Sequence, residues 1–186
     1  SLSATRVKGT CVIIEDLAFA IEDLGDALMD LQLLLNKSGF SKTGIYGHCL
    51  DGNVHFILSK SFVDSSDIDA FHSFMNDLAV LVIDKYNASL KAEHGTGRSI
   101  APFLEKEWGK DAVEIMIKIK NLIDPDNILN PDVIISKDNR IHLKNIKQIP
   151  QVNEIIDKCI ECGFCESVCP SRDYTLNPRM RLDISQ

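Results

Sequence analysis

Residues 47–55 read Gly-His-Cys-Leu-Asp-Gly-Asn-Val-His, with one histidine on each side of an Asp-Gly pair. The Asp51-Gly52 pair is typical of a two-residue type I′ turn between two apolar strands. Such a turn would place His48 opposite His55, with Cβ atoms about 4.5 to 5.5 Å apart on one face of the sheet. Two imidazoles so placed can share a metal ion. The alternative is two unrelated strand histidines, and the turn alone does not decide between them.

The flanking patterns predict the fold class. An apolar run at residues 11–14 predicts a strand, and leucines at 3-4 spacing before Gly39 predict a helix. Residues 43–59 form the hairpin, and a second amphipathic helix follows it. Strand, helix, hairpin and helix in this order predict an α+β domain, a ferredoxin-like split βαβ plait with an antiparallel sheet and helices on one face. A further helix is expected to bury Ala112, Ile115, Ile119 and Leu122.

Composition narrows the class of protein. The chain has 186 residues, 27 acidic against 20 basic, and a formal net charge of -7, so nucleic acid is not expected as a partner. No apolar run approaches the roughly 18 residues of a membrane span. Four of the six cysteines lie between Cys159 and Cys169, which suggests metal binding in a reducing cytoplasm rather than disulfides.

A second group of candidate ligands follows the second helix, in residues 92–98, Ala-Glu-His-Gly-Thr-Gly-Arg. Its two glycines allow the backbone to approach a ligand closely. One interpretation makes Glu93 a third metal ligand beside His48 and His55, with His94 as a general base. The other is an ordinary helix C-terminus with a solvated Glu and a His that neutralises the helix dipole. Local spacing does not choose between them.

The cysteine run Cys159-x2-Cys162-x2-Cys165-x3-Cys169-Pro170 matches the bacterial iron–sulfur ligand pattern. Gly163 keeps its tight loop sterically open. In two-cluster proteins the fourth cysteine ligates the other cluster, and this chain has no second run, so an incomplete set of 4Fe-4S clusters is expected. A zinc site is the alternative.

These residues together resemble the C-terminal (cap) domain of FAD-linked D-2-hydroxyacid dehydrogenases that carry a 4Fe-4S module. The resemblance is carried by the hairpin motif, by Ala92-Glu93-His94-Gly95, by Ile123-Asp124-Pro125 and by Ile128-Leu129-Asn130-Pro131. It implies domains at 1–135 (cap) and 151–186 (the start of a ferredoxin-type domain, expected to be small and mainly helical), joined by a linker at 136–150.

The resemblance also implies roles for individual residues. His48, His55 and Glu93 fall on the ligands of a divalent metal such as Zn or Mn, and His94 falls on the catalytic base. Asn130 and Asn53 fall on positions expected to bind the cofactor. The family's glycine before the Asp-Gly pair is Leu50 here, and a Leu50 side chain on the histidine face would narrow the substrate range.

The implied reaction is oxidation of a D-2-hydroxyacid to the 2-oxoacid, with electrons passing through FAD and the clusters to a quinone or another carrier. D-lactate is the first expectation for the substrate, and D-2-hydroxyglutarate and glycolate are the alternatives. We expect the FAD domain and further iron–sulfur ligands elsewhere in the same polypeptide, so that this chain alone is inactive. A cytoplasmic location is expected, either free or at the inner face of the membrane. The competing interpretation is an electron-transfer or docking module with a vestigial histidine site.

Overall fold

The structure is a computed structural model that describes residues 10–62, 64–146, 152–156, 159 and 162–185. A larger compact unit comprises Ile14–Leu58 and Val63–Ile146, and residues 152–185 belong to a second unit. Parts of the predicted cap domain, linker and iron–sulfur segment lie outside the described residues. The boundaries at 135 and 151 therefore stay predictions.

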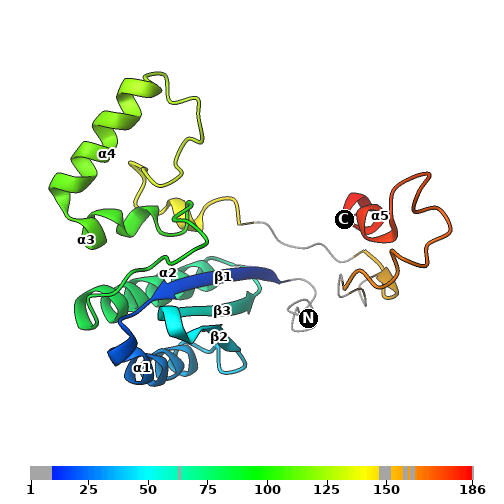
Figure 1. Ribbon diagram of the computed structural model, residues 1–186, viewed down its shortest axis with the longest axis horizontal. Coiled ribbons are helices and arrows are strands. Elements are labelled where there is room, and N and C mark those ends of the chain that lie inside the picture. The colour runs from blue at the N-terminus through cyan, green and yellow to red at the C-terminus, as the bar shows by residue number, and fades with distance from the viewer. Residues whose placement is uncertain (1–9, 63, 147–151, 157–158, 160–161, 186) are drawn as a thin grey trace. The chain divides into compact units, whose positions relative to one another are not determined.

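A three-stranded sheet forms the centre of the larger unit (Figure 1), with β1 (Cys11–Ala18), β3 (Asn53–Lys60) and β2 (Ile45–His48) in that spatial order. β2 and β3 pair antiparallel. β1 also runs antiparallel to β3, because Thr10 Oγ1 lies 2.7 Å from Ser59 Oγ at one end and the N–H of Phe19 donates to Gly52 O at the other. The predicted α+β class with an antiparallel sheet is confirmed.

The hairpin has a different register from the predicted one. Cys49–Asp51 form a 3-10 turn and Gly52 closes it with φ +66°, so the loop is longer than two residues. His48 pairs with Asn53, and Tyr46 pairs with His55. The prediction that His48 lies directly opposite His55 is therefore wrong. A shift of two residues nevertheless keeps both histidines on the same face, because side chains alternate faces with period two.

Helices α1 (Leu24–Lys37) and α2 (Ser65–Ala79) contact each other and cover the face of the sheet that lies opposite the two histidines. On that face Val54, Phe56 and Leu58 of β3 are buried. Phe74 of α2 lies at the centre of this core, with ring centroids 6.3 Å from Phe56 and 5.1 Å from Phe40. Burying a side chain of this size contributes about 1.5 to 3 kcal/mol. The apolar stripes predicted for the two helices are buried at Leu31, Leu35, Phe71, Met75 and Leu78. Ile21, which the first stripe was expected to include, is 59% exposed.

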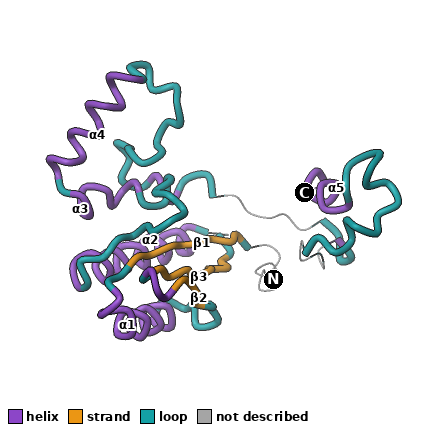
Figure 2. Tube along the Cα trace, viewed as in Figure 1, coloured by secondary structure: helices purple, strands orange, loops and turns teal. Residues whose placement is uncertain are grey.

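After α2 the chain continues through a π-helical segment (Val80–Lys85) and returns to β1. Ala18 and Ser89 form an isolated antiparallel bridge, with N···O distances of 3.0 and 2.9 Å. Figure 2 shows this return as a loop rather than a strand. The segment that follows carries Glu93 and His94. The alternative interpretation of Glu93 and His94 as an ordinary helix C-terminus is wrong, because the bridge to β1 lies between the helical segment and these residues.

α3 (Leu104–Trp108) and α4 (Lys110–Ile123) follow, and α4 extends away from the sheet (Figure 1). The predicted buried face of this helix is wrong, because Ile115 is 57% exposed, Ile119 54% and Leu122 84%. Asp124 ends α4 and is buried, accepting N–H bonds from Ile128 and Leu129, both at 2.9 Å.

A 3-10 turn (Ile141–Leu143) packs its three side chains into the same unit. The ring of His142 lies 5.6 Å from Phe103 and 6.4 Å from Phe71 between centroids, and its Nε2 is 3.2 Å from Nδ1 of His72. Burial in these apolar surroundings lowers the pKa of His142 from 6.5 to about 4, and the positive charge of Arg140 acts in the same direction.

The second unit contains the cysteine run and α5 (Pro178–Ser185). Among the helices of the described residues, none combines the length and the apolar character needed to cross a bilayer.

Candidate functional site

Three predicted ligands meet on the face of the sheet opposite α1 and α2. Oε1 of Glu93 lies 3.0 Å from Nε2 of His55 and 3.4 Å from Nε2 of His48. The ligand atoms of all three residues lie within 4.8 Å of one another. His55 is buried, with a side chain 5% exposed, while His48 and Glu93 are 60% and 52% exposed. The set therefore has a fixed inner member and two members open to solvent.

The hairpin register explains why the two histidines meet edge to face. They are diagonal rather than directly opposed neighbours, and their ring centroids are 5.6 Å apart at an interplanar angle of 88°. Diagonal neighbours are still within reach when the side chains are long or aromatic. Gly47 is required here, because a Cβ at this position would lie 2.1 Å from the carbonyl oxygen of Asn53.

The donor set fits a divalent metal ion. Ligands bound about 2.0 to 2.2 Å from one ion are separated from each other by about 3 to 3.5 Å. Oε1 of Glu93 lies 3.0 and 3.4 Å from Nε2 of the two histidines, within that range. Two imidazoles and one carboxylate suit Zn²⁺ and other divalent ions of intermediate softness. Three protein ligands leave further coordination positions for oxygen atoms of a small molecule.

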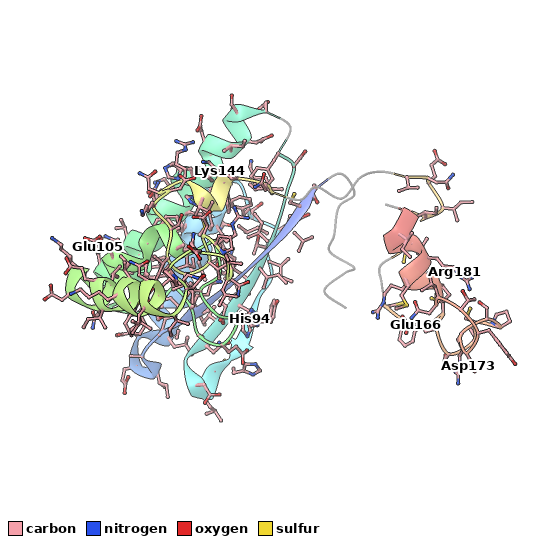
Figure 3. The ribbon with its side chains drawn as sticks, turned by 90° about the horizontal axis from the view of Figure 1, so that it is seen from above. His94, Glu105, Lys144, Glu166, Asp173 and Arg181 are labelled. Carbon is pink, nitrogen blue, oxygen red and sulfur yellow. The ribbon has the colours of Figure 1, made fainter. Side chains whose placement is uncertain are left out.

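His94 lies beside this set and is labelled in Figure 3. Its ring is stacked on that of His55, with centroids 4.7 Å apart and an interplanar angle of 10°, and its Nε2 is 3.9 Å from Oε1 of Glu93. The side chain is 45% exposed, so one face of the imidazole is covered and the other is accessible. This arrangement suits a proton acceptor beside a bound substrate.

Asp16 of β1 lies behind the set and was missed by sequence reasoning. Its side chain is completely buried, and its Oδ2 accepts N–H bonds from Ala92, Glu93 and His94 at 3.0, 2.7 and 2.8 Å. Burial by itself raises the pKa of Asp16, but these bonds and one from Asn53 outweigh it and hold the pKa below the ordinary value. The only sequence signal is a pair of acidic residues inside an apolar strand.

The other acid of that pair, Glu15, is also buried. Its Oε2 lies 2.9 Å from Nζ of Lys91, whose side chain is 11% exposed, while its Oε1 has no hydrogen-bond partner among the described residues. Burial raises the pKa of the Glu15 carboxyl, and Lys91 opposes that rise. The ion pair ties the segment before Glu93 to β1.

The remaining predicted residues lie around this set or away from it. Asn53 is buried and donates from Nδ2 to Oδ1 of Asp16 at 2.9 Å. Asn130 lines a mostly apolar cavity of about 590 Å³ between α3, α4 and residues 129–135. Their cofactor roles stay predictions. Leu50 lies in the 3-10 turn rather than in a strand, and it is 90% exposed. The expectation that its side chain lies on the same face of the sheet as the two histidines is therefore wrong.

The cysteine run occupies an irregular stretch in which Gly163 has φ +78°, as expected for a tight loop. Within the described residues, no three of the four thiols lie within 4.8 Å of one another. A hydrogen bond from Ser171 lowers the pKa of Cys169, whose Sγ is 3.3 Å from the Ser171 hydroxyl. Lower thiol pKa values favour the thiolate that ligates iron. Arg181 and Glu166, labelled in Figure 3, belong to the same unit.

Comparison with protein families finds two matches. Residues 2–134 match the family described as FAD linked oxidases, C-terminal domain. Residues 154–172 match the 4Fe-4S binding domain, so the cysteine run is an iron–sulfur motif.

Similar proteins agree with the first match. The chain is 32% identical over 126 residues to a probable mitochondrial D-2-hydroxyglutarate dehydrogenase of Oryza sativa, covering 67% of this chain and 21% of that protein. It is 34% identical over 83 residues to a probable mitochondrial D-lactate dehydrogenase of Danio rerio, covering 44% of this chain and 16% of that protein. It is 28% identical over 141 residues to glycolate oxidase subunit GlcD of Bacillus subtilis, covering 75% of this chain and 29% of that protein.

The chain spans about a fifth of the length of the first of these relatives. The match to the family covers most of the chain, including the hairpin and the segment with Glu93 and His94. The chain therefore belongs to the FAD-linked oxidases, of which it carries the C-terminal domain together with a 4Fe-4S binding motif.

Proposed function

We propose that this chain is the substrate-side part of an FAD-dependent dehydrogenase that oxidises a D-2-hydroxyacid to the 2-oxoacid. The observation that carries the proposal is the convergence of His48, His55 and Glu93 beside His94, in a domain of the FAD-linked oxidase family. D-lactate remains our first expectation for the substrate. D-2-hydroxyglutarate and glycolate are the alternatives, and the similar proteins named above include all three activities in their names.

In this proposal His48, His55 and Glu93 hold a divalent ion, Zn²⁺ or Mn²⁺. Such an ion would act as a Lewis acid and a template for the substrate's hydroxyl and carboxylate oxygens. The two exposed ligands, His48 and Glu93, mark the side open to the substrate, while the buried His55 fixes the inner side. Two neutral imidazoles and one carboxylate do not fully neutralise a divalent ion. The remaining positive charge would attract the substrate's carboxylate.

His94 is the proposed general base. Its Nε2 would accept the proton of the substrate's C2 hydroxyl, and a bound flavin would supply the acceptor for the C2 hydrogen, which leaves with its electron pair as hydride. The substrate thus loses one proton and one hydride and becomes the 2-oxoacid. His55, stacked against the covered face of His94, keeps the imidazole from rotating away from this position.

We further propose that FAD is held chiefly by another domain of the same polypeptide, with Asn130 and Asn53 near it. When bound, FAD and an iron–sulfur cluster at the cysteine run would supply a path for the substrate's electrons to a quinone or another carrier. The support for this order is the presence of the FAD-linked oxidase and 4Fe-4S matches in one chain.

The test uses the complete flavoprotein, assayed with an artificial electron acceptor on D-lactate, D-2-hydroxyglutarate and glycolate. We expect Glu93→Gln to lose the divalent ion and activity together. His94→Gln should keep the ion and lower kcat by about 10²- to 10⁴-fold, the usual contribution of general-base catalysis. His72→Gln is the matched control, since this half-buried histidine lies on α2 and contacts His142 rather than the site. Activity that survives chelation and both site substitutions would refute the proposal.

The competing electron-transfer module makes a different prediction. If the histidine site were vestigial, the pure protein would contain no divalent ion apart from iron. Elemental analysis that finds Zn or Mn at about one ion per chain in the wild type, and none in His48→Ala, would exclude it.

A further inference from the structure

One carboxylate connects the two halves of the candidate site. Oδ2 of Asp16 accepts hydrogen bonds from the backbone N–H groups of Ala92, Glu93 and His94, at 2.7 to 3.0 Å. These are consecutive residues, and two of them carry the third proposed ligand and the proposed base. Hydrogen bonds to a charged acceptor are roughly twice as strong as neutral ones, so three on one buried oxygen fix the local backbone.

The second oxygen of Asp16 faces the hairpin. Oδ1 accepts a hydrogen bond from Nδ2 of Asn53 at 2.9 Å and lies 3.1 Å from Nδ1 of His55. The Nδ1 contact is within hydrogen-bond distance but is not well aligned, and Nδ1 has no other partner among the described residues. A metal ion bound between Nε2 and Glu93 needs the lone pair of Nε2, so the ring proton then belongs on Nδ1, beside Oδ1 of Asp16.

The direction of the His55 ring agrees with that proton position. Its Nε2 points to Oε1 of Glu93 at 3.0 Å, while Nδ1 points to Asp16. A metal ligand needs a lone pair on the coordinating nitrogen, and the hydrogen bond made by the other nitrogen sets which one has it. The ring of His55 is therefore held between two carboxylates, that of Asp16 at Nδ1 and that of Glu93 at Nε2.

Asp16 is placed for support rather than for ligation. Asp16, His55 and His94 also have ligand atoms within 4.8 Å of one another, and these three residues could form an alternative metal set. The four hydrogen bonds that Asp16 already accepts, together with a side chain that is completely buried, leave its oxygens committed to neighbouring donors. The set with His48 and Glu93 has two members open to solvent, whereas the alternative set has one, His94.

We infer that Asp16 is the positioning residue of this site, which orients His55 for metal binding and holds the backbone that carries Glu93 and His94. The inference rests on the proposed function, in that His48, His55 and Glu93 bind a divalent ion. β1 thereby determines the geometry of a site to which it contributes no ligand. The Ala18–Ser89 bridge and the Lys91–Glu15 ion pair bring the loop to β1, and Asp16 sets its final position.

The test is substitution of Asp16 in the complete flavoprotein, with Zn²⁺ as the probe. In Asp16→Asn the single remaining oxygen can face either the three N–H groups or His55, but not both. If it faces the loop, the amide NH2 meets Nδ1 of His55, which must then accept, and the ring proton moves to Nε2. Asp16→Ser is the second variant, because it places no NH2 group against the three donors and keeps the test open if Asp16→Asn does not fold.

Zn²⁺ affinity is measured by competition with a chelator after removal of bound metal, alongside the thermal midpoint. We expect both Asp16 variants to bind Zn²⁺ about 10- to 100-fold more weakly, the usual effect of losing an outer-shell partner. The matched control is Asp124→Asn, a buried aspartate that also accepts backbone N–H bonds but belongs to the end of α4. It should lower the thermal midpoint and leave Zn²⁺ affinity unchanged. A purely structural role for Asp16 would move the midpoint alone.

The outcomes separate the two proposals. If the wild type binds no Zn²⁺ or Mn²⁺, the proposed metal site fails. If the wild type binds Zn²⁺ and the folded Asp16 variants bind it within about threefold of the same affinity, the metal site stands and the positioning role is overturned. Weaker binding in the Asp16 variants, with unchanged affinity in Asp124→Asn, supports both.

Discussion

Acidification should destabilise the larger unit through His142. The group is neutral in the folded state down to a pKa of about 4, whereas in the unfolded chain it titrates at 6.5. Its contribution to stability is therefore complete above pH 6.5 and is lost as the pH falls, because only the unfolded state gains the proton. The groups that face it are His72 on α2, with Arg140 lowering its pKa and Asp138 opposing that effect.

The magnitude follows from the two pKa values. A difference of about 2.5 units corresponds to about 3 kcal/mol once the pH is below 4. Between pH 7 and pH 5 the linkage relation gives about 2 kcal/mol, a large part of the roughly 5 to 15 kcal/mol that stabilises a typical domain. The aspartates with lowered pKa values, such as Asp124 and Asp138, begin to lose their contribution only at lower pH.

The assay is urea denaturation near pH 7 and near pH 5, followed by circular dichroism with a chelator present, so that metal binding does not contribute. His142→Gln is the comparison, because the amide keeps a partner for His72 and does not titrate. We expect the wild type to lose about 2 kcal/mol more than the variant on acidification. Equal losses in the two proteins would refute the reasoning that the buried His142 stays neutral.

Three further predictions concern single residues. Gly52→Ala should lower the free energy of unfolding by about 2 kcal/mol or more, since φ is +66° and a Cβ would lie 2.0 Å from Phe19 O; Gly39→Ala, with φ +84° and open space, should cost about 1 kcal/mol. Lys91→Met should cost about 3 to 5 kcal/mol by stranding the buried Glu15, whereas Lys110→Met, which breaks an exposed pair with Glu114, should cost less than about 1 kcal/mol in the same urea titration. Cys165→Ser should reduce iron bound after anaerobic purification while Cys49→Ser leaves it unchanged, and equal iron content in both would contradict an iron–sulfur role for the run.

Much of the fold could be predicted because it depends on local periodicity. The leucine stripe of α1 and the apolar face of α2 repeat at helical spacing, and both are buried. The exposed α4 shows the limit of that rule, because periodicity predicts an apolar face but not which surface covers it. The hairpin shows another limit, since Asp51-Gly52 predicts a turn but not its length. The left-handed Gly52 was correct, and the register was two residues off.

The candidate site was predictable in part. His48, His55, Glu93 and His94 were selected from local motifs and from the family resemblance, and the structure brings them together. Asp16 has no local motif, because its partners are 37 to 78 positions away in the chain. Its role depends on the antiparallel course of β1 beside β3 and on the return of the chain at Ser89. Neither feature can be deduced from the spacing of residues around Asp16.

The three N–H groups held by Asp16 also provide a measure of how often this part of the molecule opens. Ala92, Glu93 and His94 lie in a loop and are exposed, so their amides would ordinarily exchange with deuterated solvent within seconds or less. Bound to a buried carboxylate, they can exchange only when the loop separates from β1. The exchange rate of these three amides therefore reports the free energy of loop opening at the site without any substrate or assay of turnover.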